Sequence, residues 1–442
     1  MKLSLKPIKN IFEIEELRNR ILTTLLFIAI YRLGSFIVLP GVNTDTLSSG
    51  SGNDDNLLLG LLDSFTGGAF TNSAIFGLGI MPYISASIVV QLAQFAIPAV
   101  QKLQREGESG RKKINQITRL LTIVVCVLQS FGFITYITHT DGVLYSDVDP
   151  QFFTIQSVII LTAGTLFCMW MGEQITERGI GNGVSLLIMI GIIARFPTSI
   201  LQHVATNGAD GLILYLIEII FFFAIVMGTV LIVQGVRKIP INYAKQVVNN
   251  KVYGGQRQYI PLKVNQAGVM PIIFAQAVMM LPTLLSRTDT TIGKFMQEYM
   301  STPYTVGYNI LLAVLIILFT FFYTAMIIQP NQIADDLKRN GGFIPGVKPG
   351  QPTANFIDTV LSRITFPGAV FIVIIAILPA IAKSFGIDGN LAYFFGGTSL
   401  LIMVGVVLDT VQQIQGYMLM KKYEGMMKSG KVKDTKSSAA VA

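Results

Sequence analysis

The chain has 442 residues, of which 52% are hydrophobic and only 13% are charged, so an ordinary soluble domain is excluded and a lipid-embedded protein is the natural interpretation. The only cysteines, Cys126 and Cys168, lie in apolar stretches, which excludes a disulfide framework. The two histidines, His139 and His203, have no cysteine or carboxylate at ligand spacing, so the sequence predicts no metal site.

Ten apolar runs follow one another along the chain, each close to the roughly 20 residues that one helix needs to cross a bilayer core. They are residues 21–39, 73–97, 117–137, 152–172, 183–201, 212–234, 266–285, 308–329, 366–382 and 390–411. Ten buried helices in a soluble protein would require an implausibly large core. The predicted fold class is therefore an all-α membrane protein with ten transmembrane helices.

Basic residues gather on one side of these predicted spans. Most of the 33 lysines and arginines lie in the N-terminal arm, in the loops after spans two, four, six and eight, or in the C-terminal tail. The opposite loops hold only Arg287, Lys294 and Lys383. The positive-inside rule places both termini in the cytoplasm, so topology explains most of the net charge of +8 without nucleic-acid binding.

The two ends of the chain lack features of a further span. Residues 1–20 are too long and too charged for the n-region of a signal peptide, so we expect span one to be retained. Residues 431–442 are polar and basic, which is typical of a disordered tail.

Residues 57–70 form an apolar run that is too short to cross the membrane. Its polar and glycine positions favour a re-entrant half-helix that is shielded by protein or lines a cavity. An amphipathic helix lying at the outer interface fits the local sequence equally well.

Span two carries an unusual polar stripe. Tyr83, Ser87, Gln91 and Gln94 recur at helical spacing, which indicates a face toward water or another helix. Taken alone, this stripe is more typical of polar contacts between helices than of a pore.

Two cytoplasmic loops are longer than a connection requires. The loop at about 235–265 alternates apolar and polar residues around Gly254 and Gly255, which predicts a protruding β-hairpin. The loop at about 330–365 predicts a helix that stops at Gly341 and Gly342, a turn, and a second helix capped by Thr353.

The predicted membrane interior holds few of the ionisable residues that a secondary transporter normally uses. Glu218, Arg32, Arg195 and Asp409 all fall near span ends, so we expect them to extend toward the interface. A secondary transporter is the alternative interpretation, because Gly and Pro interrupt several spans. A membrane enzyme is less well supported, since no nucleophile, base and orienting group occur together, and no phosphate-binding loop is present.

Long sequence words along the chain resemble the SecY family of protein-translocation channels. They include FGLGIMPYISASIVVQL, EGESGRKKI, GEQITERGIGNGVSLLI, INYAK, IPLKVNQAGVMP, FFYTA, IADDLKRNGGFIPGVKPG and YFFGGTSLLI, in the family's order from about residue 10 to 425. The resemblance implies two pseudo-symmetric five-helix halves around a central pore. It divides the chain into a cytoplasmic arm 1–20, a first half 21–205, a second half 206–411 and a cytoplasmic tail 412–442.

The resemblance also implies roles for individual residues. A pore ring would comprise Ile80, Ile84, Val184, Ile188, Ile273 and Ile402, where Val184 replaces the expected isoleucine. A plug would include Leu61, Leu62, Asp63, Ser64, Phe65, Thr66, Gly67 and Gly68. A lateral gate would use Ser87, Gln91, Gln94 and Gln276, and the partner-docking loops would use Arg237, Lys238, Lys245, Lys251, Arg257, Lys263, Lys338, Arg339 and Lys348.

The implied function is a passive protein-conducting channel in the inner membrane, with no cofactor and no enzymatic activity of its own. It would pass unfolded secretory chains and release transmembrane segments into lipid. Implied partners are the SecE and SecG subunits, the SecA motor, the ribosome, signal peptides, nascent chains and membrane lipids. Lys348 replaces the family's usual arginine, and Asn250 and Lys251 replace a basic pair, so docking contacts are expected to differ.

Overall fold

The computed structural model describes residues 14–43, 65–138, 143–145, 149–207, 212–243, 246–248, 251–253, 257–285, 304–384 and 397–428. A helix occupies each of the ten predicted spans. These helices are α2 (Glu15–Gly34), α5 (Met81–Ala96), α7 (Glu108–Thr138), α8 (Pro150–Arg178), α9 (Gly183–Asn207), α10 (Leu212–Gln234), α11 (Met270–Leu285), α13 (Val306–Ile327), α15 (Gln351–Ser384) and α17 (Gly397–Lys428).

Within the described residues, 7 helical stretches are long and apolar enough to cross a membrane. The expectation of an all-α membrane protein is confirmed. Helices α5 and α11 fall short because each has 16 residues, or about 24 Å of rise, against a bilayer core of about 30 Å.

The described residues form two compact units. The first holds the residues up to Ala194 and those from Val406 onward, and the second holds Arg195–Gly405. Helices α9 and α17 therefore contribute to both units.

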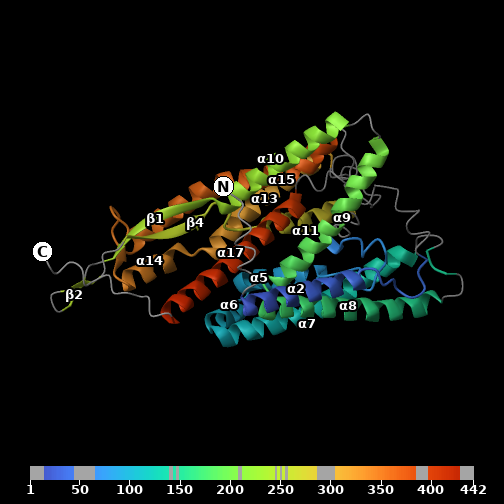
Figure 1. The fold of residues 1–442 in the computed structure, drawn as a ribbon, viewed down its shortest axis with the longest axis horizontal. Helices are drawn as coiled ribbons and strands as arrows, with labels where there is room; N and C mark the ends of the chain where they lie inside the picture. Colours follow the sequence, from blue (N-terminus) through green and yellow to red (C-terminus); the bar gives the residue numbers. More distant parts are fainter. Residues whose placement is uncertain are drawn as a thin grey trace. The chain divides into compact units, whose positions relative to one another are not determined.

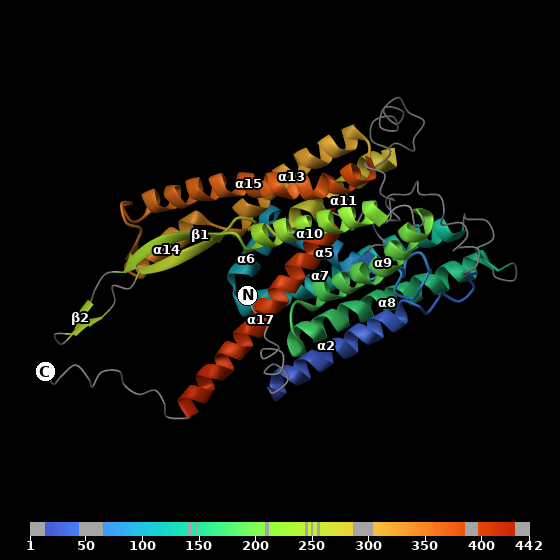
Figure 2. The same cartoon turned by 45° about the horizontal axis from the view of Figure 1, so that its top comes forward.

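In the first unit, α7 packs against α5 and α8, and α8 packs against α2 (Figures 1 and 2). A short helix, α6 (Pro98–Arg105), joins α5 to α7. Glycine permits the closest approaches of backbone: a Cβ at Gly164 of α8 would collide with the carbonyl of Ile75, and one at Gly183 of α9 would collide with the carbonyl of Gly172. The segment before α5 and the start of α9 thus lie directly on α8.

The N-terminal part of predicted span two is not helical. Only Phe65 and Thr66 have helical backbone in the segment 65–80, and turns follow as far as Ile80. The physical cause is Gly79, whose positive φ of 51° leaves the right-handed helix, followed by Pro82 in the first turn of α5. Residues 76–80 are buried, as non-helical backbone at membrane depth must be.

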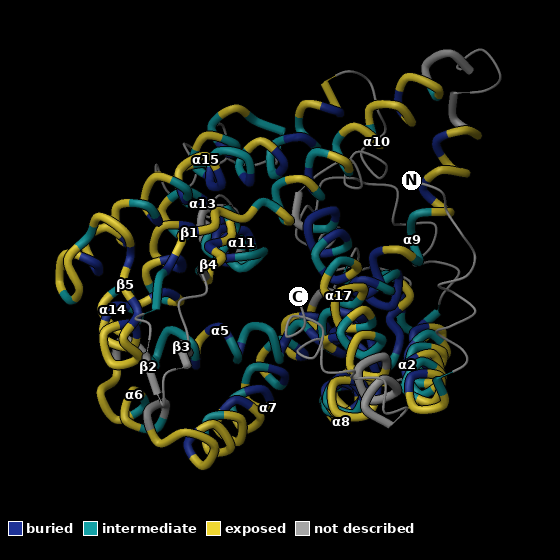
Figure 3. Tube along the Cα trace, turned by 60° about the vertical axis from the view of Figure 1, so that its left-hand side comes forward, coloured by how far each residue is buried: buried dark blue, intermediate teal, exposed yellow. Residues whose placement is uncertain are grey.

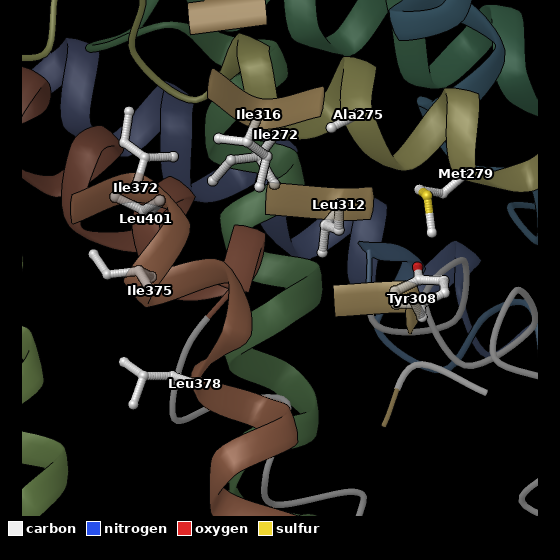
Figure 4. Packing of buried hydrophobic residues seen from close by; sticks show 10 residues of the cluster. All are labelled: Ile272, Ala275, Met279, Tyr308, Leu312, Ile316, Ile372, Ile375, Leu378 and Leu401. Atoms are coloured by element: carbon white, nitrogen blue, oxygen red, sulfur yellow. The ribbon is translucent and has the colours of Figure 1, made fainter. Parts of the chain in front are cut away.

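The second unit has an apolar core between α11, α13, α15 and the start of α17. Figure 4 shows its buried members, which are Ile272, Ala275, Met279, Tyr308, Leu312, Ile316, Ile372, Ile375, Leu378 and Leu401. By contrast, only Glu218 and Thr229 are buried among the described residues 215–234 of α10, and the others are exposed or half-buried (Figure 3). An apolar helix with so little cover is suited to lipid or to an apolar partner.

The predicted hairpin is confirmed, although the chain reverses at a different place. Strand β1 (Val236–Tyr243) pairs antiparallel with β4 (Arg257–Lys263), and β2 (Gln246–Val248) pairs with β3 (Lys251–Tyr253). Because Val248 pairs with Lys251, the reversal falls between those two residues and not around Gly254 and Gly255. Gly254 and Gly255 themselves lie outside the described residues.

The second long loop packs against the first. Helix α14 (Pro330–Arg339) ends as predicted ahead of Gly341, whose φ is +67°, and β5 (Gly342–Phe343) then adds to the edge of β1. A small buried core joins both loops to α15, with Ile239, Leu262, Ile328, Ile344, Ile357 and Leu361 as its buried members. The two loops therefore form one platform, defined here as β1, β4, α14, β5 and the first half of α15.

The predicted cap at Thr353 is wrong. Helix α15 begins at Gln351, two residues earlier, so Thr353 lies inside the first turn. Its hydroxyl donates to the carbonyl of Lys348, 2.9 Å away, and so fastens the turn to the helix. The helix then continues without a break into span nine, where it includes Pro367 and Pro379.

Candidate functional site

Four of the six residues predicted for the pore ring belong to the first unit. Ile80 immediately precedes α5 and Ile84 lies in its first turn; Val184 and Ile188 lie in the first two turns of α9. Ile80 is 5% exposed and Ile188 is 9% exposed, whereas Ile84 and Val184 are half-buried. Each pair therefore stands at the beginning of a helix, one turn apart.

The other two predicted ring residues belong to the second unit. Ile273 is half-buried on α11 and is flanked by Ile272, a member of the apolar core. Ile402 of α17 is 5% exposed and follows Leu401, which belongs to the same core. All six predicted ring side chains are aliphatic and uncharged, and each is at least partly buried.

The described part of the predicted plug is a tight turn on α9. Leu61, Leu62, Asp63 and Ser64 lie outside the described residues, whereas Phe65, Thr66, Gly67 and Gly68 are described. We call residues 65–70 the plug turn. Gly67 and Gly68 have φ values of 65° and 94°, which favour glycine, so the predicted half-helix ends here in a left-handed turn.

Backbone contacts hold the plug turn in place. A Cβ at Gly67 would lie 2.7 Å from the carbonyl oxygen of Gly191, and one at Gly191 would collide with the carbonyl of Phe65. Two chain segments can approach so closely only because both positions lack a side chain. Gly191 is one turn beyond Ile188, so the plug turn rests beside the α9 pair of predicted ring residues.

Thr66 links the plug turn to the other pair of ring residues. Its side chain is buried, and its Oγ1 accepts a hydrogen bond from the backbone N–H of Phe70 at 3.2 Å. A Cβ at Gly79 would lie 3.2 Å from the Thr66 methyl group. Because Gly79 directly precedes Ile80, the plug turn contacts both chain segments that carry ring residues in the first unit.

Arg32 is half-buried and makes two contacts within the protein. One guanidinium nitrogen donates to the carbonyl of Gly67 at 3.1 Å, and the guanidinium carbon lies 5.2 Å from the centre of the Phe36 ring. A charge-assisted hydrogen bond therefore fastens the plug turn to the C-terminal end of α2. The partner is 35 residues away, so local sequence gave no signal for it.

Glu218 also makes a contact within the protein. It is 8% exposed on α10, and its Oε2 lies 3.1 Å from Nε2 of His203, which is 1% exposed on α9. The edge of the His203 ring faces Tyr215. A polar pair on either side of a predicted loop is the signal that could have revealed this contact between α9 and α10.

The predicted lateral-gate residues are half-buried on two helices. On α5, Gln91 donates from Nε2 to Oγ of Ser87 at 3.2 Å, and Gln94 follows on the same stripe. Gln276 lies on α11 of the second unit. Such a contact can be exchanged for another polar partner at small cost, about 0.6 kcal/mol in a membrane.

The register of the hairpin sorts the predicted docking residues. Lys238 pairs with Pro261, and Val236 pairs with Lys263, so both lysines lie on the solvent face with Tyr259. Arg237 pairs with the buried Leu262 on the opposite face, although its own side chain is exposed.

The other predicted docking residues are placed less completely. Lys338, Arg339 and Lys348 are exposed on the platform. Lys245 and the side chains of Lys251 and Arg257 lie outside the described part of the chain.

The described part of the chain holds no group of three or more His, Cys, Asp or Glu side chains that could bind a metal ion. Cys126 and Cys168 are buried free thiols. The features that the described residues do bring together are apolar side chains at two helix starts and a glycine-rich turn packed against both.

Comparison with known proteins agrees with these features. A family model described as SecY matches residues 74–411. The chain is 38% identical to the protein translocase subunit SecY of Chlamydia trachomatis, over 96% of this chain and 99% of that protein. It is 42% identical to the subunit of the same name from Streptomyces coelicolor, over 94% and 98% of the two chains.

Two solved structures share the fold. One is a protein-conducting channel with a TM-score of 0.58 and 17% identity, covering 90% of this chain and 92% of that one. The other is Sec61 in the canine ribosome-channel complex, with a TM-score of 0.53, 16% identity and the same coverage of 90% and 92%. Since the family model spans most of the sequence and full-length relatives match throughout, the chain belongs to the SecY family.

Proposed function

We propose that the chain is the channel subunit of a protein translocase in the inner membrane, with both termini in the cytoplasm. It passes unfolded polypeptides across the bilayer and releases transmembrane segments sideways into lipid, without an enzymatic activity of its own. The carrying observation is the match to translocase subunits along 94% or more of the chain. The aliphatic residues beside the plug turn support it.

In this proposal, Ile80, Ile84, Val184, Ile188, Ile273 and Ile402 form the constriction. A narrow apolar ring cannot replace the hydration shell of an ion, so it loses water and blocks conduction. The same ring offers a passing polypeptide no hydrogen bond that must be broken. Flexible aliphatic side chains can adjust to each residue, which provides a seal without a binding trap.

The plug turn is proposed to complete the closed state. It is held by backbone contact with Gly191, by Thr66 packing on Gly79 and by one hydrogen bond from Arg32. None of these contacts buries a large apolar side chain against another. Residues 65–68 can therefore be displaced at little cost in hydrophobic burial, as is required of a segment that must move whenever a chain passes. Phe70, which is 6% exposed and whose ring centre lies 4.5 Å from that of Phe133, anchors the end of the turn.

Lateral release is proposed to occur between α5 and α7 of the first unit and α11 and α13 of the second. Ser87, Gln91, Gln94 and Gln276 would line this seam, and an apolar guest helix would replace their weak polar contacts with lipid-like packing. Hydrophobic segments then partition into the bilayer because their apolar side chains favour it.

The platform is the proposed docking surface for SecA and for the ribosome, and SecE and SecG are the proposed companion subunits. A stiff surface costs less conformational entropy on binding than two loose loops would. The exposed lysines Lys238, Lys263 and Lys348 suit carboxylates of a motor or phosphates of ribosomal RNA.

We expect Lys348→Glu to reduce motor-driven secretion several-fold while leaving the amount of membrane-inserted protein unchanged. Lys348 is exposed in the turn that Thr353 fastens to α15, so the substitution reverses a surface charge without disturbing the fold. Secretion of a precursor by membrane vesicles supplied with SecA and ATP measures the effect.

Lys421→Glu makes the same charge change at an exposed position on α17 and serves as the control. Equal secretion by the two variants would remove position 348 from the docking surface.

The function itself is tested by reconstitution. Purified complex in proteoliposomes should import a secretory precursor when SecA and ATP are supplied, and should show no saturable uptake of small solutes. Saturable solute uptake without precursor import would support the transporter alternative instead.

A further inference from the structure

The turn between α8 and α9, residues 179–182, is held by side chains from two distant helices. The backbone N–H of Ile180 donates to Oγ1 of Thr24 on α2 at 3.1 Å, and that of Gly181 donates to Oε1 of Gln413 on α17 at 2.9 Å. The partners are 156 and 232 residues away in sequence. All of these residues belong to the first unit.

Ile180 and its acceptor Thr24 are both buried, so water cannot replace that acceptor, whereas Gly181 is buried but its acceptor Gln413 is an exposed residue. Gly181 has a φ of 84°, and a Cβ there would lie 3.0 Å from Oγ1 of Thr410. At Gly179 a Cβ would collide with the Thr24 hydroxyl. The turn is thus fitted closely to both helices, and its shape depends on glycine.

Arg20 connects the two helices that hold the turn. One guanidinium nitrogen lies 3.4 Å from the carbonyl oxygen of Gly179, and the guanidinium carbon lies 5.0 Å from the centre of the Tyr417 ring on α17. A cation placed over an aromatic ring is attracted to it electrostatically. Together, Arg20, Thr24, Gln413 and Tyr417 form what we call the turn clamp.

Immediately after the clamped turn, α9 begins and carries Val184 and Ile188. A helix rises about 1.5 Å per residue, so Ile188 lies only about 8 Å along the axis from Gly183. The start of α9 is itself tied to α8, since the N–H of Gly183 donates to Oγ1 of Thr176 at 2.9 Å. We therefore expect a shift of the turn to move the side chains of Val184 and Ile188 by a similar distance.

We propose that Thr24 and Gln413 are positioning residues, which set the height and rotation of Val184 and Ile188 and thereby the tightness of the constriction. This inference rests on the proposed pore role of those two residues. It assigns Thr24 of α2 and Gln413 of α17 an indirect function in the seal, in addition to the direct one proposed for Ile402 of α17. Thr24 and Gln413 act through backbone N–H groups, so their effect depends on acceptor atoms and not on apolar packing.

The test replaces each acceptor by a side chain of similar shape that cannot accept a hydrogen bond. Gln413→Met and Thr24→Val should each raise ion leak through the closed channel about five-fold, the change that loss of one intramolecular hydrogen bond brings to an equilibrium. Both should also increase secretion of a precursor with a defective signal sequence relative to an intact one. Thr24→Ser, which keeps the acceptor hydroxyl, should restore wild-type behaviour; Gln413→Glu is unsuitable, because the amide of Gln413 donates to Oδ2 of Asp409 at 3.4 Å and a second carboxylate there would be repelled.

Neighbouring positions supply matched controls. Gln412 is exposed beside Gln413, and the Thr23 hydroxyl donates only within α2, to the carbonyl of Asn19, among the hydrogen bonds described for it. Gln412→Met and Thr23→Val should therefore leave leak and signal discrimination unchanged. Ile188→Asn serves as the direct test of the ring in the same assay.

The outcomes separate the two proposals. If Ile188→Asn leaks while Gln413→Met and Thr24→Val do not, the turn clamp has no positioning role although the ring stands. If none of the three leaks, the ring itself is wrong. If the Gln413→Met and Thr24→Val proteins are lost from the membrane without a leak, or if Thr24→Ser does not keep the seal, the clamp is a purely structural contact and the inference is overturned.

Discussion

Replacing Gly191 by alanine is expected to raise ion leak through the resting channel about ten-fold. The added Cβ would collide with the carbonyl of Phe65, so the plug turn could not remain on α9. Overpacking of this kind costs about 1–3 kcal/mol, and every 1.4 kcal/mol changes a population by about ten-fold. Membrane potential measurements on proteoliposomes without substrate would report the leak.

Gly132 of α7 provides the control for this experiment. A Cβ there meets nothing within 4 Å, so Gly132→Ala makes the same chemical change in a helix without touching a neighbour. It should leave the leak unchanged. A Gly191→Ala channel that is as tight as the Gly132→Ala channel would mean that the plug turn does not help to seal it.

Ile402→Asn is expected to produce a comparable leak by a different route and to relax discrimination against defective signal sequences. Ile402 is 5% exposed, and an asparagine amide at this position would retain the water molecules that hydrate it. Burying the amide without a hydrogen-bond partner costs about 1–3 kcal/mol, which is enough to raise the population of the hydrated constriction about ten-fold. Secretion of a precursor with a charged residue in its signal sequence would measure the loss of discrimination.

Val407 lies on the same helix and is 45% exposed, so Val407→Asn controls for a polar residue elsewhere on α17. We expect normal leak and normal discrimination from it. Equal behaviour of the two variants would argue that Ile402 is an ordinary packing residue.

The sequence predicted the helical spans well because lipid imposes long apolar runs on any chain that crosses it. It failed where backbone conformation is decided locally. Gly79 and Pro82 end the helical part of span two, which apolarity alone could not reveal. Likewise, the hairpin loop has two turn-prone stretches, one between Val248 and Lys251 and the other at Gly254 and Gly255. The pairing of Val248 with Lys251 shows that the chain reverses in the first.

Contacts between residues that are distant in sequence were the second feature that the sequence did not predict. Arg32 was interpreted as an interfacial side chain because its position near a span end is visible in the sequence, whereas its partner Gly67, 35 residues away, is not. For Glu218, the histidine on the other side of the loop was a visible signal that position alone did not use. The turn clamp was missed for the same reason as the Arg32 contact, since Thr24 and Gln413 are ordinary polar residues near the ends of the first and last predicted spans. Motif resemblance named the ring residues, yet it gave no account of what holds them in place.

The central claim is that a polypeptide in transit touches the proposed ring. A secretory chain stalled midway through the channel should crosslink to photoreactive residues placed at Ile84 and at Ile188. It should not crosslink to one placed at Leu128, which is 68% exposed on the outer face of α7. Crosslinks at Leu128 in the absence of any at Ile84 and Ile188 would contradict the channel that we propose.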